Sequence, residues 1–158
     1  MRALIQRVTH AHVDIRSEDG TTTRAGSIGP GLLILVASTP DDDAATAEAL
    51  AEKIFQQRIL DNEQSLASTG ADALVVSQFT LYADARKGRR PSYSAAAPAS
   101  VAEPIYQDFC AALRQRVETA GGKVAEGVFG AMMEVSSTNY GPYTLWLDTD
   151  ELARPRRS

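Results

Sequence analysis

The residues that most directly suggest chemistry are two histidines and an aspartate that alternate along one short segment. His10, His12 and Asp14 are spaced by two, so on a β-strand their side chains project from the same face. Two imidazoles and a carboxylate are a ligand set suited to zinc or iron. The intervening Ala11 and Val13 are apolar, however, and this alternation is typical of a strand with one solvated face. We favour the solvated face and expect no metal; a metal-dependent hydrolase stays as an alternative.

Nucleophilic side chains activated by a neighbouring base have no recognisable motif in this chain. The sequence contains no Gly-x-Ser-x-Gly elbow, no phosphate-binding loop and no dinucleotide fingerprint. Its one cysteine, Cys110, falls in a predicted helix, where a buried small hydrophobe is the expected role. If the protein is an enzyme, catalysis must rest on backbone donors, substrate groups or water, and we expect no cofactor.

Two segments suggest sites built from backbone groups. Residues 75–80, Val-Val-Ser-Gln-Phe-Thr, form a buried strand that ends in hydroxyl and amide side chains, a place where an oxyanion hole can be assembled. Residues 138–143, Thr-Asn-Tyr-Gly-Pro-Tyr, set a Gly-Pro step between two strands, and X–Pro bonds can be cis. A simpler interpretation remains open for each segment: residues 75–80 would be only the end of a strand, and residues 138–143 only a plain turn.

The elements that must position these segments follow from the hydrophobic pattern. Strands are predicted at residues 2–8, 11–16, 21–24, 32–36, 73–77, 124–128, 133–137 and 143–147. Helices are predicted at residues 41–60 and from about 100 to 120. Residues 61–72 are expected to form a loop, residues 78–82 to continue the strand before them, and Ser100 with Glu103 to form a capping box. The pattern indicates a single mixed α/β domain with two main helices.

Length and composition limit the classes of protein. The chain has 158 residues, of which 44% are hydrophobic and 23% charged, as expected for one soluble globular domain. A single cysteine excludes a disulfide-stapled scaffold. No apolar run approaches the ~20 residues of a membrane span, and no signal peptide is recognisable at the start. We therefore expect a cytoplasmic protein without a membrane partner.

Positive charge is concentrated although the net charge is −4. Four basic residues lie within one short segment: Arg86, Lys87, Arg89 and Arg90. Three more lie in the tail 149–158: Arg154, Arg156 and Arg157. An acidic protein with one basic loop is a candidate for a polyanionic partner, and a solvated charged turn is the simpler alternative.

The same segments resemble a known family. The run Ser77-Gln78-Phe79-Thr80-Leu81-Tyr82, followed by residues 86–92, resembles the first motif region of the D-aminoacyl-tRNA deacylases (D-tyrosyl-tRNA deacylase family). Asn139-Tyr140-Gly141-Pro142 resembles their second motif. Segments 1–8, 28–33 and 129–133 match in order and spacing, so the resemblance covers residues 1–148 and leaves the basic tail 149–158 outside.

The resemblance implies a layered β/β/α domain that forms a homodimer with active sites at the interface. The implied activity is hydrolysis of the ester joining a D-amino acid to tRNA, and of glycine mischarged on tRNA for alanine. Gly141-Pro142 would be cis, would enter the partner's site and would select chirality through its carbonyls, braced by Arg7. Substrate binding and chiral selection are assigned to Arg7, Ala131, Met133, Asn139, Gly141 and Pro142.

Catalysis is assigned by the resemblance to Ser77, Gln78, Phe79 and Thr80, with a backbone N–H near Phe79 facing the ester carbonyl. The 2′-hydroxyl of the terminal adenosine, rather than Thr80, is expected to help activate water. The basic loop of Arg86, Lys87, Arg89 and Arg90 would bind the phosphates of tRNA. A nucleic-acid-binding module without catalysis, using residues 86–90, is the alternative.

Three residues depart from the family pattern. Tyr140 stands where an aspartate is common, Tyr143 where a small branched residue is common, and Met132 where an acid is frequent. The two tyrosines flank the Gly-Pro step, so they are candidates to stack on the terminal adenine or to pack across the dimer.

Overall fold

One long strand organises the fold. In the computed structural model, which describes residues 1–155, β1 (Arg2–Arg16) pairs antiparallel with β2 (Thr22–Ile28), β3 (Gly31–Ala37) and β6 (Met133–Asp148). The first half of β1 lies between β3 and β6, and its second half lies between β2 and β6. Register shifts interrupt its ladders with β2 and β6, as bulges do where a strand bends.

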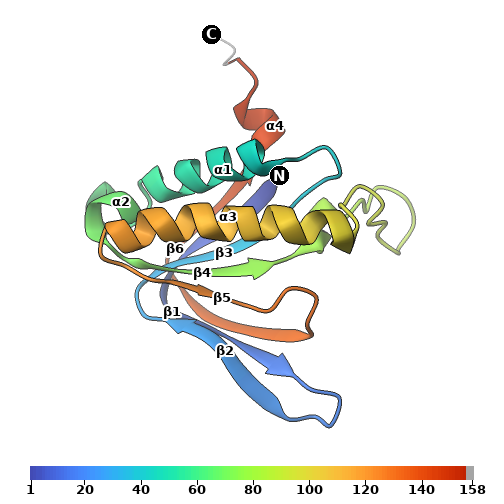
Figure 1. The fold of residues 1–158 in the computed structure, drawn as a ribbon, viewed down its shortest axis with the longest axis horizontal. Helices are drawn as coiled ribbons and strands as arrows, with labels where there is room; N and C mark the ends of the chain where they lie inside the picture. The colour runs from blue at the N-terminus through green and yellow to red at the C-terminus, as the bar shows by residue number, and fades with distance from the viewer. Residues whose placement is uncertain (156–158) are drawn as a thin grey trace.

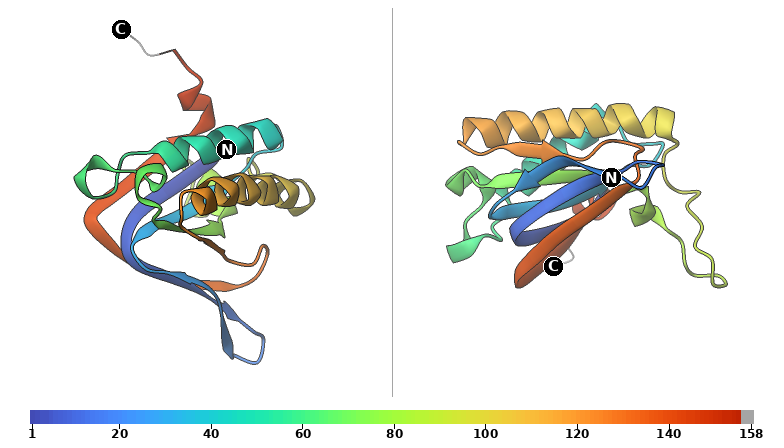
Figure 2. Two further views of the ribbon diagram at one scale, coloured as in Figure 1. Left: turned by 60° about the vertical axis from the view of Figure 1, so that its left-hand side comes forward. Right: turned by 90° about the horizontal axis from the view of Figure 1, so that it is seen from below.

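The bent sheet and the helices form three layers. β4 (Asp72–Ser77) lies parallel to β3, and β5 (Val124–Glu126) lies parallel to β4. The helices α1 (Ala44–Gln56) and α3 (Ala99–Thr119) cover one face of β3 and β4 (Figure 1). The sheet curves so that β2, the second half of β1 and the first half of β6 cover the other face (Figure 2). The predicted mixed α/β class with two main helices is confirmed, and the layers are β/β/α.

Two apolar clusters hold the layers together. Leu32 and Ile34 of β3 face the helices, where they meet Phe109 and Leu113 of α3. The alternate residue Leu33 belongs to the second cluster, between the two β layers. β3 is thus buried on both faces, as its continuous apolar run predicts.

The start of α1 and the end of α3 each have a recognisable signal. The carboxylate of Asp43 accepts a hydrogen bond from the Thr46 N–H at 2.8 Å and caps α1. α3 ends before Gly121, whose φ of 98° continues the chain in a conformation that favours glycine. No helix in the described part of the chain is long and apolar enough to cross a membrane.

Several predicted boundaries differ from the structure. The predicted strand pairs 2–8 with 11–16 and 133–137 with 143–147 are each one continuous strand, because β1 and β6 stay paired across their bulges. The helix predicted at 41–60 is restricted to α1, since Asp43 is its cap and the chain is extended at Gln57. Residues 61–72 contain a 3₁₀ turn, η1 (Asp61–Glu63), and the short helix α2 (Leu66–Thr69).

Two further expectations fail at chain turns. Residues 78–82 do not continue β4, because Gln78 leaves the strand conformation and the 3₁₀ turn η2 (Phe79–Tyr82) follows. The capping box predicted at Ser100 is absent from the described structure: α3 begins after Pro98 without a side-chain cap.

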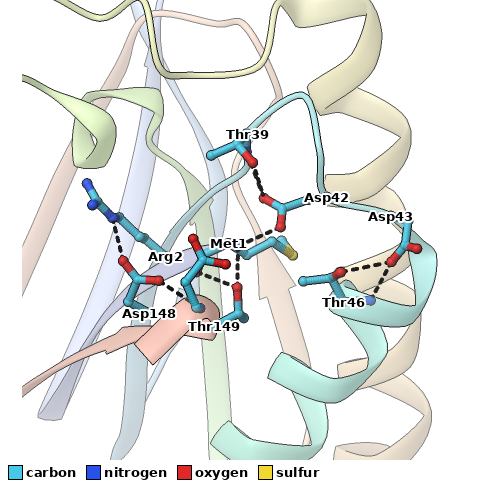
Figure 3. Close-up of polar contacts among 9 residues, drawn as sticks. Met1, Arg2, Thr39, Asp42, Asp43, Thr46, Asp148 and Thr149 are labelled. Carbon is cyan, nitrogen blue, oxygen red and sulfur yellow. Dashed lines mark hydrogen bonds and ion pairs between the residues drawn. The ribbon is translucent and has the colours of Figure 1, made fainter. Parts of the chain in front are cut away.

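Polar contacts at Met1 join three segments (Figure 3). Its buried α-ammonium group donates to Asp42 Oδ1 at 2.8 Å and to Thr149 Oγ1 at 2.6 Å. Arg2 Nε donates to Asp148 Oδ2 at 2.9 Å. The contacts join β1 to the loop before α1 and to α4 (Thr149–Leu152), so part of the predicted tail is helical. Arg156 and Arg157 lie outside the described residues.

The close approach of β3 to β4 generates a stability prediction. A Cβ on Gly31 would overlap the backbone carbonyl of Asp72, whereas a Cβ on Gly29 would meet nothing within 4 Å. We expect Gly31→Ala to lower the free energy of unfolding by about 1–3 kcal/mol, the usual cost of overpacking, and Gly29→Ala to change it little. Urea unfolding measures both; equal stability of the two variants would contradict the prediction.

Candidate active site

A cavity of about 630 Å³ lies at the carboxyl ends of the parallel strands β3 and β4. Ligands of α/β sheets commonly bind at this edge, where the strands end and polar backbone groups become available. The lining comes from four parts of the chain and from Met1: residues 36–38, residues 76–79, residues 97, 99, 102 and 106, and residues 129–133 with 135.

The turn after β4 presents backbone donors at this edge. Gln78 has φ −147° and ψ 81°, and its N–H donates to the Val36 carbonyl at 2.9 Å. The first hydrogen bond of η2 runs from the Leu81 N–H to the Gln78 carbonyl, at 3.1 Å. The N–H groups of Phe79 and Thr80 come before it and therefore have no acceptor within the turn. Groups of this kind can stabilise a developing oxyanion.

Side chains around the turn complete this corner. Gln78 Nε2 donates to Thr80 Oγ1 at 2.7 Å, so the threonine hydroxyl is engaged within the same turn. The Phe79 ring is 58% exposed and meets the Tyr93 ring edge-on at a centroid distance of 5.3 Å. Phe79 thus forms an exposed apolar wall of the cavity.

The cavity offers no charged side chain among the described residues that line it. Burial raises the pKa of the Tyr106 hydroxyl, which donates to the Val75 carbonyl at 3.4 Å, and keeps it neutral. Burial likewise raises the pKa of the Cys110 thiol, which lies in the helix-side core and outside the lining. Neither group is therefore available as an ionised nucleophile near neutral pH.

The alternating His10, His12 and Asp14 lie outside the cavity lining. Asp14 accepts a hydrogen bond from Arg24 Nε at 2.5 Å, which lowers the pKa of its carboxyl group. His10 Nε2 lies 3.3 Å from Thr138 Oγ1. Within residues 1–155, no group of three or more His, Cys, Asp or Glu residues could hold a metal ion. The described structure thus gives no support to the metal-dependent alternative.

The Gly-Pro segment lies elsewhere, opposite Arg7 of β1. The resemblance implies a cis bond between Gly141 and Pro142, but every peptide bond in residues 1–155 is trans. The trans form of an X–Pro bond is favoured by about 0.5–1 kcal/mol, and Gly141 turns the chain through a φ of 108°. Asn139 Nδ2 donates to the Arg7 carbonyl at 2.9 Å and to the Tyr143 carbonyl at 3.1 Å, which holds the segment on β1.

The structure separates the predicted site residues into two groups. The cavity gathers Ser77, Gln78, Phe79, Ala131 and Met133, with Thr80 bonded to Gln78. The second group, Arg7, Asn139, Gly141 and Pro142, contributes nothing to its lining.

Sequence reasoning missed other lining residues, chiefly Ser38, Tyr106 and Phe129. Tyr106 follows the apolar spacing of α3 and was indistinguishable from a core residue. The lining also contains Met132, a departure from the family pattern, which is 70% exposed.

The basic loop is closed by a pair of backbone hydrogen bonds between Asp84 and Ser92, at 2.7 and 2.9 Å. Arg86 donates to both carboxylate oxygens of Asp84, and these bonds lower the pKa of that carboxyl group to about 2. The remaining cations of the loop, at positions 87, 89 and 90, are exposed and form no ion pair within residues 1–155. Three of the four predicted phosphate contacts are therefore available to a polyanion.

Known proteins resemble this chain along nearly its whole length. A family model described as D-Tyr-tRNA(Tyr) deacylase matches residues 4–148. The chain belongs to this family. Curated relatives include a D-aminoacyl-tRNA deacylase of Micrococcus luteus, 52% identical over 158 residues and covering 99% of both chains. Another, of Acidothermus cellulolyticus, is 54% identical over 151 residues, covering 95% of this chain and all of the relative.

Solved structures share the fold of the family. One, titled c-Myc DNA Unwinding Element Binding Protein, has a TM-score of 0.82 and 33% identity, covering 94% of this chain and 98% of that one. A second, titled as a probable eukaryotic D-amino acid tRNA deacylase, has a TM-score of 0.77 and 19% identity. The match covers 92% of this chain and 97% of that one. The second likeness concerns the fold alone.

Proposed function

We propose that the protein hydrolyses the ester bond of D-aminoacyl-tRNA, releasing tRNA and the free D-amino acid as chiral proofreading in translation. Glycine mischarged on tRNA for alanine is a second substrate. The observation that carries the proposal is the cavity at Ser77, Gln78 and Phe79, whose described lining has no charged side chain, in a chain 52% identical to a named deacylase over 158 residues. Membership of the family and the strand-end position of the cavity support the same chemistry.

Hydrolysis in this cavity relies on backbone groups. Water attacks the ester carbonyl, the carbonyl oxygen gains negative charge, and the N–H groups at Phe79 and Thr80 stabilise that charge. One such donor is worth about 2.7–4 kcal/mol of barrier in known cases. The 2′-hydroxyl of the terminal adenosine helps activate the water, as the family resemblance implies, and the described lining of the cavity, which has no charged side chain, is consistent with that role.

Chirality is selected at the α-carbon. Main-chain carbonyls of Gly141 and Pro142 accept hydrogen bonds from the α-ammonium group of the substrate, with Asn139 and Arg7 holding the segment in place. An L side chain would then point into the protein, while a D side chain points outward. Glycine has no side chain and cannot be excluded.

A homodimer brings the two groups of site residues together. The cavity and the Gly-Pro segment share no residue within one chain, so a second copy supplies the segment to the cavity. β6 pairs only with β1 within residues 1–155, and an unprotected edge strand is a natural surface for pairing between chains. Val135 and Trp146 of β6 are 40% and 44% exposed, which leaves apolar area for the partner to cover.

The central test compares ester substrates. Purified protein is incubated with D-tyrosyl-, L-tyrosyl- and glycyl-tRNA, each with and without a chelator. We expect selective loss of the D and glycyl esters at rates that the chelator leaves unchanged. Turnover abolished by chelator would favour the metal-dependent alternative. Absence of turnover would favour a nucleic-acid-binding module, which the likeness to the DNA-element-binding structure also suggests.

Two substitutions separate the catalytic roles. We expect Thr80→Ala to keep substantial activity, because the hydroxyl bonds to Gln78 and backbone groups stabilise the oxyanion. We expect Pro142→Ala to relax D-over-L selectivity or to remove activity, since proline fixes φ next to the selecting carbonyls. Single-turnover deacylation measures both. A Thr80→Ala variant that is inactive yet folded and able to bind tRNA would assign the nucleophile to Thr80.

The basic loop should govern affinity rather than chemistry. Replacing Arg89 and Arg90 with glutamine should raise KM for D-tyrosyl-tRNA, leave kcat unchanged, and reduce the slope of log affinity against log salt by about 1 per lost phosphate contact. Lys53→Gln on α1 changes the net charge in the same sense, at an exposed position outside the loop, and serves as the control. An unchanged salt slope would identify the loop as a solvated turn.

A further inference from the structure

The Arg7 guanidinium is enclosed by groups from two distant segments. Its central carbon lies 4.6 Å from the Tyr140 ring centroid and 5.0 Å from the Tyr143 ring centroid. Nε donates to the Tyr140 carbonyl at 3.0 Å, and Nη1 lies 3.2 Å from Asp61 Oδ1 of η1. The Arg7 side chain is 14% exposed, so most of it is taken out of water.

The arrangement places the guanidinium directly against Gly141. A Cβ at position 141 would overlap Arg7 Nη2, so a side chain there would displace the guanidinium; the φ of 108° itself favours glycine. The tyrosines stand immediately before Gly141 and after Pro142, and both rings contact the same cation. Both rings thus contact Arg7 of their own chain.

These contacts have a physical basis in the two side-chain types. A guanidinium is planar and weakly hydrated, so it lies well on aromatic faces while its N–H groups stay free for acceptors in its own plane. Arg7 uses those N–H groups on the Tyr140 carbonyl and on Asp61. A branched aliphatic residue at 140 or 143 would offer no ring face, and the arginine would have fewer contacts limiting its rotamers.

We propose that Tyr140 and Tyr143 are positioning residues: they hold the Arg7 guanidinium through the contacts of both rings with it and so fix the Gly141-Pro142 segment that selects chirality. The inference rests on the proposed function for its catalytic consequence, but the enclosure of Arg7 is a property of the free protein. We refer to these two rings and Arg7 as the arginine clasp.

The first test measures the environment of the Arg7 guanidinium in the free protein, without any substrate. The Nε–Hε resonance of Arg7 is identified in NMR spectra of the full chain by its loss in Arg7→Met. We expect the chemical shift of this resonance to be displaced by the rings, and to stay displaced in Tyr140→Phe and Tyr143→Phe. In Tyr140→Leu and Tyr143→Leu it should move toward the chemical shift of a solvated arginine. The phenylalanine variants are matched controls because they keep the rings. An Arg7 resonance that is the same in the leucine variants as in the parent would overturn the proposal.

The second test measures how the two tyrosines affect the selectivity for D- over L-aminoacyl esters. The ratio of kcat/KM for D-tyrosyl- and L-tyrosyl-tRNA should fall about 5-fold for each leucine substitution, consistent with the strength of a partly exposed cation–π contact, and stay within about 2-fold for phenylalanine. In an Arg7→Met background the leucine substitutions should cause no further loss, because the rings act through Arg7. The same loss in both backgrounds would refute a role through Arg7. If the parent protein hydrolyses no ester, the proposed function fails, and the NMR result still decides the clasp.

Discussion

The structure depends on the ability of β1 to hydrogen-bond with three strands at once. Its first half belongs to the layer beneath the helices, and its second half belongs to the outer β layer, so the bend between them joins the two layers. Arg7 lies at this bend, between Gln6 and Val8, where the register against β6 shifts. The irregularity that lets the sheet fold over itself also lets β6 bulge outward at Gly141-Pro142. The bend of the sheet and the Gly141-Pro142 bulge thus share the irregular pairing around Arg7.

The chemistry of the cavity is defined by what its wall contains: backbone donors at a strand end, a few uncharged polar side chains, and many apolar side chains that include methionines and aromatic rings. Charged side chains lie outside the lining, in the basic loop after η2 and in ion pairs on the outer faces, while the α-ammonium group of the lining residue Met1 is paired with Asp42. The division suits a substrate whose charge is carried mainly by phosphates while its reactive ester is neutral. Affinity can be supplied at a distance by sequence-independent contacts, and under the proposed function the ester would meet a wall without charged side chains.

Elements with strong local signals were predictable from the sequence. The apolar run of β3, the presence of α1 and the end of α3 near residue 120 follow from neighbouring residues, and so does the alternation at His10 and His12. The continuity of β1 and β6 was not predictable, because it depends on pairing across bulges between segments at opposite ends of the chain. The motif at residues 77–80 indicated one wall of the cavity, but Tyr106 and Phe129 reach it only through packing of α3 and the loop before β6. The contacts of Tyr140 and Tyr143 with Arg7 likewise required the fold.

β6 carries several parts of the molecule on one continuous segment. At the start of β6, Met133 and Val135 belong to the cavity wall, and Gly141-Pro142 lies in the middle of the strand. At the end of β6, Asp148 pairs with Arg2 beside the contacts of Met1. If two copies pair as proposed, β6 would both contact the partner and place the carbonyls of Gly141 and Pro142 in the partner's cavity. The fraction of complete sites would then depend on protein concentration. Dilution below the dissociation constant of the dimer would abolish deacylase activity while each chain stayed folded. Cellular concentration would in that case act as a threshold for proofreading.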